Sequence, residues 1–155
     1  MDFEHLKLSN QLCFPVYAAS RLIIREYQPY LDQLGITYPQ YLVLMVLWET
    51  DEISVNEITQ KLILNTNTVT PLLKRMETLG IITRIRSEKD ERKVVISLTD
   101  KGREMKFTAT AIPHELANNL NAGTLTMNQL IELRTNLNLL VNFLNNKQVS
   151  KVEID

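Results

Sequence analysis

The sequence predicts a mainly α-helical fold that carries one small β-hairpin. Apolar residues recur at helical spacing over most of the chain. Two short runs rich in β-branched residues, 81–86 and 94–98, flank a polar turn and predict the hairpin. The 155 residues are 45% hydrophobic and 23% charged, which is typical of a globular protein with a sizeable core.

The first two helices are expected to be long and partly buried. We expect one to begin near Ser9–Pro15 and to end near Gln33, where Gly35 is a suitable stop. The next follows Thr37-Tyr38-Pro39, with the proline in its first turn. Its stretch 41–48 is almost wholly apolar, so this helix should be central and buried.

Two shorter helices are expected next. Ser54-Val55-Asn56-Glu57 has the pattern of a capping box, in which the serine and the glutamate satisfy free amides at a helix start. Asn65-Thr66-Asn67-Thr68 offers further capping side chains. The second short helix should begin near Asn67–Thr68, with Pro71 in its first turn, and end at Leu79-Gly80.

The hairpin strands, Ile81–Arg86 and Val94–Leu98, follow, and Thr99-Asp100 then caps a fifth helix expected over residues 100–120. A sixth is expected over residues 126–145.

A short helix, a tight connection, a second helix and a hairpin together make a winged helix-turn-helix. In that architecture the second helix enters the major groove of DNA and the hairpin tip reaches the minor groove. We assign residues 35–102 to this DNA-binding domain. Residues 1–34 and 103–146 are expected to form helices of a dimerisation region, and 147–155 a disordered tail.

The charge distribution supports a polyanionic partner. The net charge is only −1, but residues 61–103 hold ten Lys/Arg against five Asp/Glu, a local charge of +5. Attraction to DNA depends on the local face rather than on the whole chain. The first seven residues lack the features of a signal peptide, and no apolar run is long enough to cross a membrane, so we expect a cytoplasmic protein.

The candidate DNA contacts lie on the second short helix and on the hairpin. Small polar side chains at a helix start can meet phosphates or base edges, and an arginine near a hairpin tip suits a narrow minor groove. Asp90 is expected to hold either Arg92 or the strand residue Arg84 in a fixed pose. The candidates are Asn65, Thr66, Asn67, Thr68, Thr70, Lys74, Arg75, Arg84, Asp90 and Arg92.

The last expected helix carries a leucine seam. Its members have the alternating spacing of three and four residues found in coiled coils: Leu130, Leu133, Leu137, Leu140 and Leu144. Ile131, Leu139, Val141 and Phe143 widen this surface beyond the needs of one contact. Because a single winged helix binds DNA weakly, we expect a two-fold homodimer on a palindromic operator.

Cys13 is the single cysteine of the chain and cannot form an internal disulfide. Pro15 places the start of a helix close to it, and a helix N-terminus stabilises the reactive thiolate. The phenols of Tyr27 and Tyr38 are possible hydrogen-bond donors to it across a dimer. The alternative is that Cys13 is a small buried apolar residue.

Several segments between Leu6 and Gly102 resemble the organic hydroperoxide resistance regulators of the MarR family. They are Asn10-Gln11-Leu12-Cys13-Phe14, Tyr17, Tyr27, Thr37-Tyr38-Pro39-Gln40-Tyr41, Thr68-Val69-Thr70-Pro71-Leu72-Leu73-Lys74-Arg75-Met76-Glu77, Asp90-Glu91-Arg92 and Ile96-Ser97-Leu98-Thr99. The set Cys13, Tyr27 and Tyr38 is specific to the peroxide sensors, whereas the wing and Thr-x-Thr-Pro patterns mark the wider family.

The resemblance implies a dimeric repressor that leaves operator DNA when an organic hydroperoxide oxidises Cys13 to the sulfenic acid. Tyr27 and Tyr38 of the partner subunit would hold the reduced form. With no second cysteine, the chain looks like the single-cysteine type, whose sulfenate is capped by a small cellular thiol or oxidised further. The modification of Cys13 at the subunit interface would then change the relative position of the two DNA-binding domains.

Two positions depart from the pattern of these regulators. Asn65-Thr66-Asn67 stands where relatives carry Asp-Ser-Gly, which leaves the operator sequence open. Pro15 stands where an aliphatic residue is also common, which leaves the local helix geometry open.

Two other functions remain open from the sequence. In one, a small phenolic or drug-like ligand releases the DNA and Cys13 is inert. In the other, the chain is a thiol peroxidase, which the lack of a resolving cysteine or a peroxidase motif disfavours. His5 and His114 do not belong to a Cys/His cluster, so we expect no metal, no cofactor and no enzyme activity.

Overall fold

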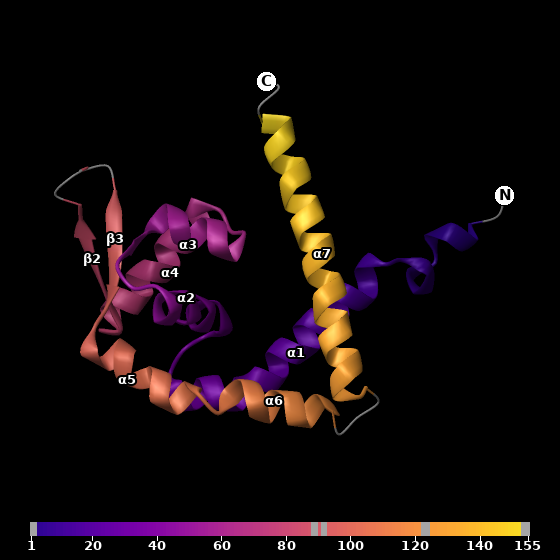
Figure 1. Ribbon diagram of the computed structural model, residues 1–155, viewed down its shortest axis with the longest axis horizontal. Coiled ribbons are helices and arrows are strands. Elements are labelled where there is room, and N and C mark those ends of the chain that lie inside the picture. Colours follow the sequence, from indigo (N-terminus) through magenta and orange to yellow (C-terminus); the bar gives the residue numbers. More distant parts are fainter. Residues whose placement is uncertain (1–2, 88–89, 91–92, 122–124, 153–155) are drawn as a thin grey trace. The chain divides into compact units, whose positions relative to one another are not determined.

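The computed structural model describes residues 3–87, 90, 93–121 and 125–152. The chain divides into two compact units, Met1–Ile112 and Pro113–Asp155. Within the first unit, helices α1 (Cys13–Leu34) and α2 (Tyr38–Glu49) precede the shorter α3 (Val55–Leu62) and α4 (Thr66–Thr78). Strands β2 (Ile82–Arg86) and β3 (Val94–Leu98) follow, and then α5 (Asp100–Ala109), as Figure 1 shows. Two short 3-10 turns, Glu4–Leu6 and Leu8–Asn10, precede α1. This order confirms the predicted winged helix-turn-helix.

The wing is a sheet of three antiparallel strands, not two. A short strand β1 (Ile53–Ser54), just before α3, pairs with β3 in the order β1-β3-β2, so that Ile53 lies opposite Ile96. Two residues are too few to show an alternating pattern, which is why the sequence did not predict β1. The strand fastens the start of α3 to the base of the wing.

The predicted caps are present at most helix starts. Thr37 and Gln40 form a capping box at α2, and Ser54 and Glu57 form another at α3. The Thr99 hydroxyl accepts from the Gly102 amide at the start of α5. Each cap satisfies amides that a helix leaves without a partner in its first turn.

Helix α4 begins at Thr66, slightly before the predicted start, because the Asn65 side chain caps the helix by accepting from the Thr68 amide at 2.9 Å. Pro71 therefore lies inside the helix and not in its first turn, which corrects the prediction. The lost hydrogen bond is the one to the Asn67 carbonyl, and Asn67 is exposed to water. The helix tolerates the proline at this position.

The predicted fifth helix, 100–120, is two helices in the structure. Helix α5 ends at Ala109, and α6 covers Ile112–Asn121. Pro113 explains the break, because it has no amide to donate to the Ala109 carbonyl. In the second unit, α7 extends over Met127–Val152, so the chain stays helical beyond Lys147, where we expected it to fray.

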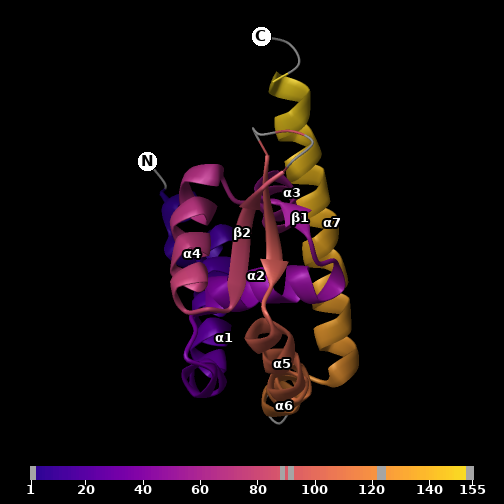
Figure 2. The same ribbon diagram turned by 90° about the vertical axis from the view of Figure 1, so that its left-hand side faces the viewer.

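The core of the first unit surrounds α2. Figure 2 shows β2 and β3 side by side, with α4 beside them and α2 behind. Side chains with almost no exposed surface come from α2, α3, α4 and the sheet: Val43, Leu44, Leu47, Ile58, Val69, Leu73, Met76, Ile81, Ile82 and Ile96. α1 packs against α2 and α5 in the same unit. This core fixes the position of α4 relative to the wing.

Gly102 marks the closest approach between α5 and the strand that follows α4. A Cβ atom there would lie 2.3 Å from the Ile81 carbonyl oxygen, a backbone atom that cannot move aside. The Gly102 carbonyl also accepts from the Trp48 indole at 2.9 Å, which ties α5 to α2. Only glycine fits this contact.

Gly102→Ala is expected to lower the free energy of unfolding by at least about 2 kcal/mol, because the added methyl group must push α5 away from Ile81. Urea unfolding followed by circular dichroism measures the loss. Glu104→Ala, at an exposed position of the same helix, is the control and should change stability by less than about 0.5 kcal/mol. Equal stability of Gly102→Ala and the control would contradict the close packing.

Candidate functional site

Cys13 is the first residue of α1, as the sequence predicted. Its side chain is exposed and not part of a disulfide. Leu12, at the cap position, makes no side-chain hydrogen bond to the helix start. The interpretation of Cys13 as a buried apolar residue therefore does not hold within one chain. The thiol is accessible to a soluble oxidant or to a second protein surface.

A tyrosine and an arginine follow Cys13 along one face of α1. Arg21 donates to the Tyr17 hydroxyl at 2.8 Å, and its guanidinium lies 5.6 Å from the centre of the Tyr17 ring. Residues 13, 17 and 21 are spaced four apart, so they share a face of the helix. Arg21 therefore brings a positive charge to the face that carries the thiol.

Tyr27 and Tyr38, the two predicted partners of the thiol, lie together. Their ring centres are 5.0 Å apart, and Tyr41 joins them at 5.8 Å from Tyr27. Burial, together with the nearby Tyr38 and Tyr41, raises the pKa of Tyr27 to about 12. Burial also raises the pKa of Tyr38 and of Tyr41. These phenols keep their protons near neutral pH and can act as hydrogen-bond donors.

The phenols do not reach the thiol of their own chain. Tyr27 follows Cys13 by 14 positions on the continuous helix α1, a separation of about 21 Å along the helix axis. Tyr38 and Tyr41 lie on α2 beside Tyr27. Tyr41 was not predicted as a site residue, although its spacing of three after Tyr38 is the signal that places both on one helix face.

The polar start of α4 divides into capping and exposed residues. Asn65 Oδ1 accepts from the Thr68 amide and hydroxyl, so these two side chains serve the cap. Thr66 and Asn67 are exposed on the first turn, and Thr70 is half-buried on the next. Lys74 and Arg75 are exposed farther along the helix. The structure thus exposes Thr66 and Asn67 at the start of α4 and places Lys74 and Arg75 farther along the same helix.

The wing carries the remaining candidates. Arg84 is paired with Glu77 of α4 at 3.4 Å, so the alternative in which Asp90 holds Arg84 is wrong. Asp90 lies 3.9 Å from the Lys93 ammonium, and its carbonyl accepts from the Lys93 amide. Arg92 lies outside the described residues, so its predicted contact stays a prediction. Glu77 and Lys93 were not predicted as site residues.

Large apolar side chains are exposed in both units. In the first they lie before α1 and in its first turn: Phe3, Leu6, Leu8, Leu12 and Phe14. In the second they lie on α7 and include Leu133, Leu140 and Leu144 of the predicted seam, together with Ile131, Leu139, Val141 and Phe143. Leu130 and Leu137 of the seam are half-buried. Apolar surface of this extent is typical of a protein–protein interface.

No group of three or more His, Cys, Asp or Glu side chains with the geometry of a metal site occurs among the described residues. In that same part of the chain, every helix is too short or too polar to cross a membrane.

Comparison with known proteins supports a transcriptional regulator. The family model "Transcriptional regulator SarA/Rot" matches residues 25–108. The organic hydroperoxide resistance transcriptional regulator of Bacillus subtilis is 54% identical over 111 residues, which covers 72% of this chain and 76% of that protein.

Solved structures agree with this assignment. Reduced AbfR bound to DNA is 38% identical, with a TM-score of 0.69 over 89% of this chain and 98% of that one. A disulfide-formed AbfR is 40% identical, with a TM-score of 0.61 over 89% of this chain and 95% of that one; AbfR comes from Staphylococcus epidermidis. MarR of Escherichia coli, at 23% identity and a TM-score of 0.67 over 84% of this chain and 96% of that one, has the same fold. This chain therefore belongs to the family of winged helix-turn-helix transcriptional regulators that includes the SarA/Rot proteins and the MarR-type regulators of organic hydroperoxide resistance.

Proposed function

We propose that this protein is a redox-sensing repressor that binds palindromic operator DNA as a homodimer. An organic hydroperoxide oxidises Cys13, and the oxidised dimer releases the DNA. The observation that carries this proposal is the separation along α1 of the exposed thiol, at the first residue of the helix, from Tyr27, which lies in a cluster of phenols with Tyr38 and Tyr41 of α2.

The DNA-binding part of the proposal rests on α4 and the wing. The exposed Thr66, Asn67 and Lys74 suit the major groove, and the segment 61–103 carries the positive charge that a polyanion requires. The DNA complex of AbfR, a relative of the same fold, supports this assignment.

The dimer explains the exposed apolar surfaces. Burial of apolar surface stabilises an association by about 25 cal/mol per Å². This gain favours contact of α7 and the N-terminal residues with a second copy of the chain. In a two-fold dimer every contact occurs twice. Tyr27 and Tyr38 of one subunit then face Cys13 of the other at two equivalent sites.

The proposed chemistry needs one thiolate and one peroxide. The Cys13 thiolate attacks the outer oxygen of the hydroperoxide, the O–O bond breaks as the S–O bond forms, and the departing alkoxide takes a proton from water to become the alcohol. Sulfur is oxidised to the sulfenic acid and the peroxide is reduced. A small cellular thiol then attacks this sulfur, forming a mixed disulfide and releasing water.

The phenols contribute by hydrogen bonding. A protonated Tyr27 or Tyr38 can donate to the thiolate and stabilise its charge. A bulky group on sulfur cannot occupy the same space as these rings. The adduct therefore separates the two subunits at this contact and changes the spacing of the two α4 helices.

Cys13→Ser separates this proposal from release by a small ligand with an inert cysteine. We expect the variant to bind operator DNA with an affinity within about twofold of the wild type, because the thiol lies far from α4. Gel-shift with a promoter fragment should show that cumene hydroperoxide releases the wild type and leaves the variant bound. Release of the variant by the peroxide would contradict the proposal.

Tyr27 should keep its proton well above the pH at which a free tyrosine loses it, because burial raises its pKa to about 12. Absorbance at 295 nm, which reports tyrosinate, should show a component near pH 12 that Tyr27→Phe removes and Tyr17→Phe leaves. An unfolded tyrosine releases its proton near pH 10, whereas folded Tyr27 keeps it to about pH 12. The contribution of Tyr27 to stability is therefore complete below pH 10 and is lost as the pH rises toward 12. An unchanged high-pH component in Tyr27→Phe would show that its ring is not enclosed.

A further inference from the structure

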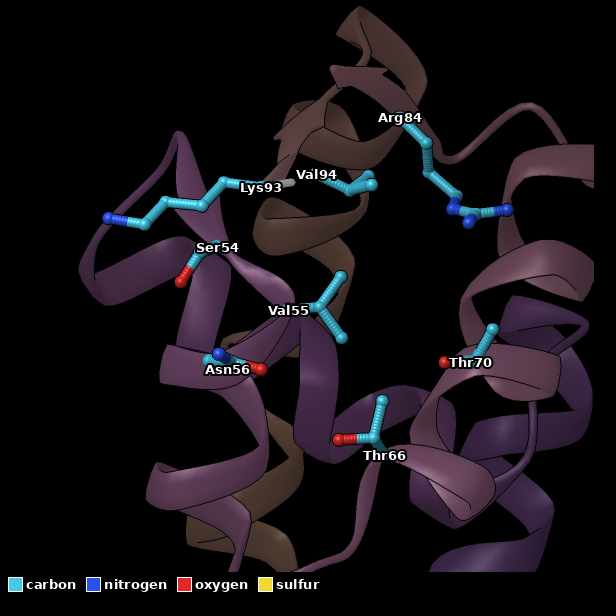
Figure 3. A pocket seen from close by; sticks show the side chains of 8 residues that line it. All are labelled: Ser54, Val55, Asn56, Thr66, Thr70, Arg84, Lys93 and Val94. Carbon is cyan, nitrogen blue, oxygen red and sulfur yellow. The ribbon is translucent and has the colours of Figure 1, made fainter. Parts of the chain in front are cut away.

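A cleft of about 240 Å³ lies between α3, α4 and the base of the wing. Figure 3 shows how its side chains are arranged: Thr66 and Thr70 come from α4, and Arg84 reaches from β2 toward Thr70. Val55 and Val94 lie across the middle, and Lys93 begins beside Val94 and extends outward past Ser54, so its ammonium points away from Arg84. The eight residues that line it are Ser54, Val55, Asn56, Thr66, Thr70, Arg84, Lys93 and Val94.

The lining has the chemistry of an oxyanion site. Two of its side chains are cationic, four carry hydroxyl or amide groups, and none is a carboxylate. Arg, Lys, Thr and Asn all donate hydrogen bonds to phosphate oxygens. Glu57 is the carboxylate next to this region in sequence, and it is engaged with the Ser54 amide and hydroxyl at 2.9 and 2.7 Å.

Arg84 has hydrogen-bonding capacity that the protein does not use. Its side chain is only 18% exposed, and its one ion pair, to Glu77, is long at 3.4 Å. Its Nε atom is buried and has no hydrogen-bond partner. A buried donor without a partner costs about 1–3 kcal/mol, so a ligand that accepts from this guanidinium recovers that energy.

The start of α3 borders the cleft. Ser54 is its cap residue, and Val55 and Asn56 are its first two helical residues, while the Glu57 carboxylate offsets the positive end of the helix dipole. Thr66 and Thr70 are four apart on α4 and share one face. Three elements therefore present donors to one space.

We propose that this cleft binds one backbone phosphate of the operator, held by Arg84 and Thr70. This inference rests on the proposed DNA-binding function and adds to it the contact that fixes how α4 lies in the major groove. A phosphate between α3 and the wing anchors the start of α4 from one side. Base edges can then be read by the exposed residues next to it, such as Asn67.

Free inorganic phosphate is the other source of the same chemistry. A cleft of this volume is large enough for a free phosphate ion as well as for a phosphate of the DNA backbone. The two sources differ in what they predict for DNA. If the cleft binds the DNA backbone, the effect of changing a lining residue depends on one particular phosphate of the duplex. If it binds the free ion, there is no such dependence.

The test replaces single phosphates of an operator by neutral methylphosphonate. The operator is first selected by the wild-type protein from random duplex DNA, and the salt dependence of its binding is recorded. We expect one phosphate in each half-site at which methylphosphonate weakens wild-type binding about tenfold. Thr70→Val and Arg84→Met should each weaken binding to unmodified DNA by about three- to tenfold. In these two variants, methylphosphonate at that one phosphate should cause no further loss of affinity.

Two controls match these variants. Thr83→Val makes the same change on an exposed residue of β2 that does not line the cleft. Glu77→Gln removes the ion pair and leaves Arg84 in place. Both should keep the full tenfold loss at the sensitive phosphate. Thermal melting of all four variants confirms that they are folded.

The outcomes separate this inference from the function on which it rests. Failure to select any DNA would overturn the proposed function. If DNA is selected, and methylphosphonate lowers the affinity of Thr70→Val and Arg84→Met as much as that of the controls, the phosphate site is contradicted and the proposed function is not. Broadening of the 31P signal of inorganic phosphate by wild type and not by Arg84→Met, without coupling to DNA, would assign the cleft to the free ion and contradict the proposal.

Discussion

The rigidity of α1 is the constraint on which the account of this protein depends. A continuous helix of 22 residues, stopped by Gly35 in a left-handed conformation, holds Cys13 and Tyr27 at a fixed separation. No change of side-chain rotamer crosses about 21 Å. A thiol and phenols that act on each other must therefore belong to different subunits. The proposed dimer therefore places the reacting atom at the contact between the two chains.

Several contacts within the first unit join α1 to the DNA-binding elements. Asp51, in the turn after α2, accepts from the Leu98 amide and pairs with Arg103 at 2.9 Å, which joins α2, β3 and α5. Trp48 adds a second link between α2 and α5 through the Gly102 carbonyl. Since α1 also packs on α2 and α5, these contacts are the route by which the proposed change at Cys13 reaches the DNA-binding elements.

Local signals in the sequence predicted most of the secondary structure. Ser54 and Thr37 begin their helices as expected, because capping depends on residues within one turn. The incorrect predictions of secondary structure have local and non-local causes. Pro113 separates α5 from α6, and this local signal was not used when one helix was predicted over 100–120. Strand β1, in contrast, depends on the pairing of Ile53 with Ile96, which is distant in sequence.

The candidate site was predictable in part for the same reason. The choice of Tyr27 and Tyr38 as site residues and the polar start of α4 follow from motifs that the sequence displays, whereas the contact between the two rings was not predicted. The partner of Arg84 and the cleft beside it do not, since they bring together α3, α4 and two strands. Spacing along the chain carries no information on such contacts.

The most direct test of the central claim uses mixed dimers. One subunit carries Cys13→Ser, and the other carries Tyr27→Phe and Tyr38→Phe, so that the single thiol and the two phenols belong to different chains. The rate at which cumene hydroperoxide forms the sulfenic acid is measured in this mixed dimer and in the dimer of the double tyrosine variant. Contact between subunits predicts a wild-type rate in the mixed dimer and a slower rate in the double variant. Equally slow oxidation in both would contradict it.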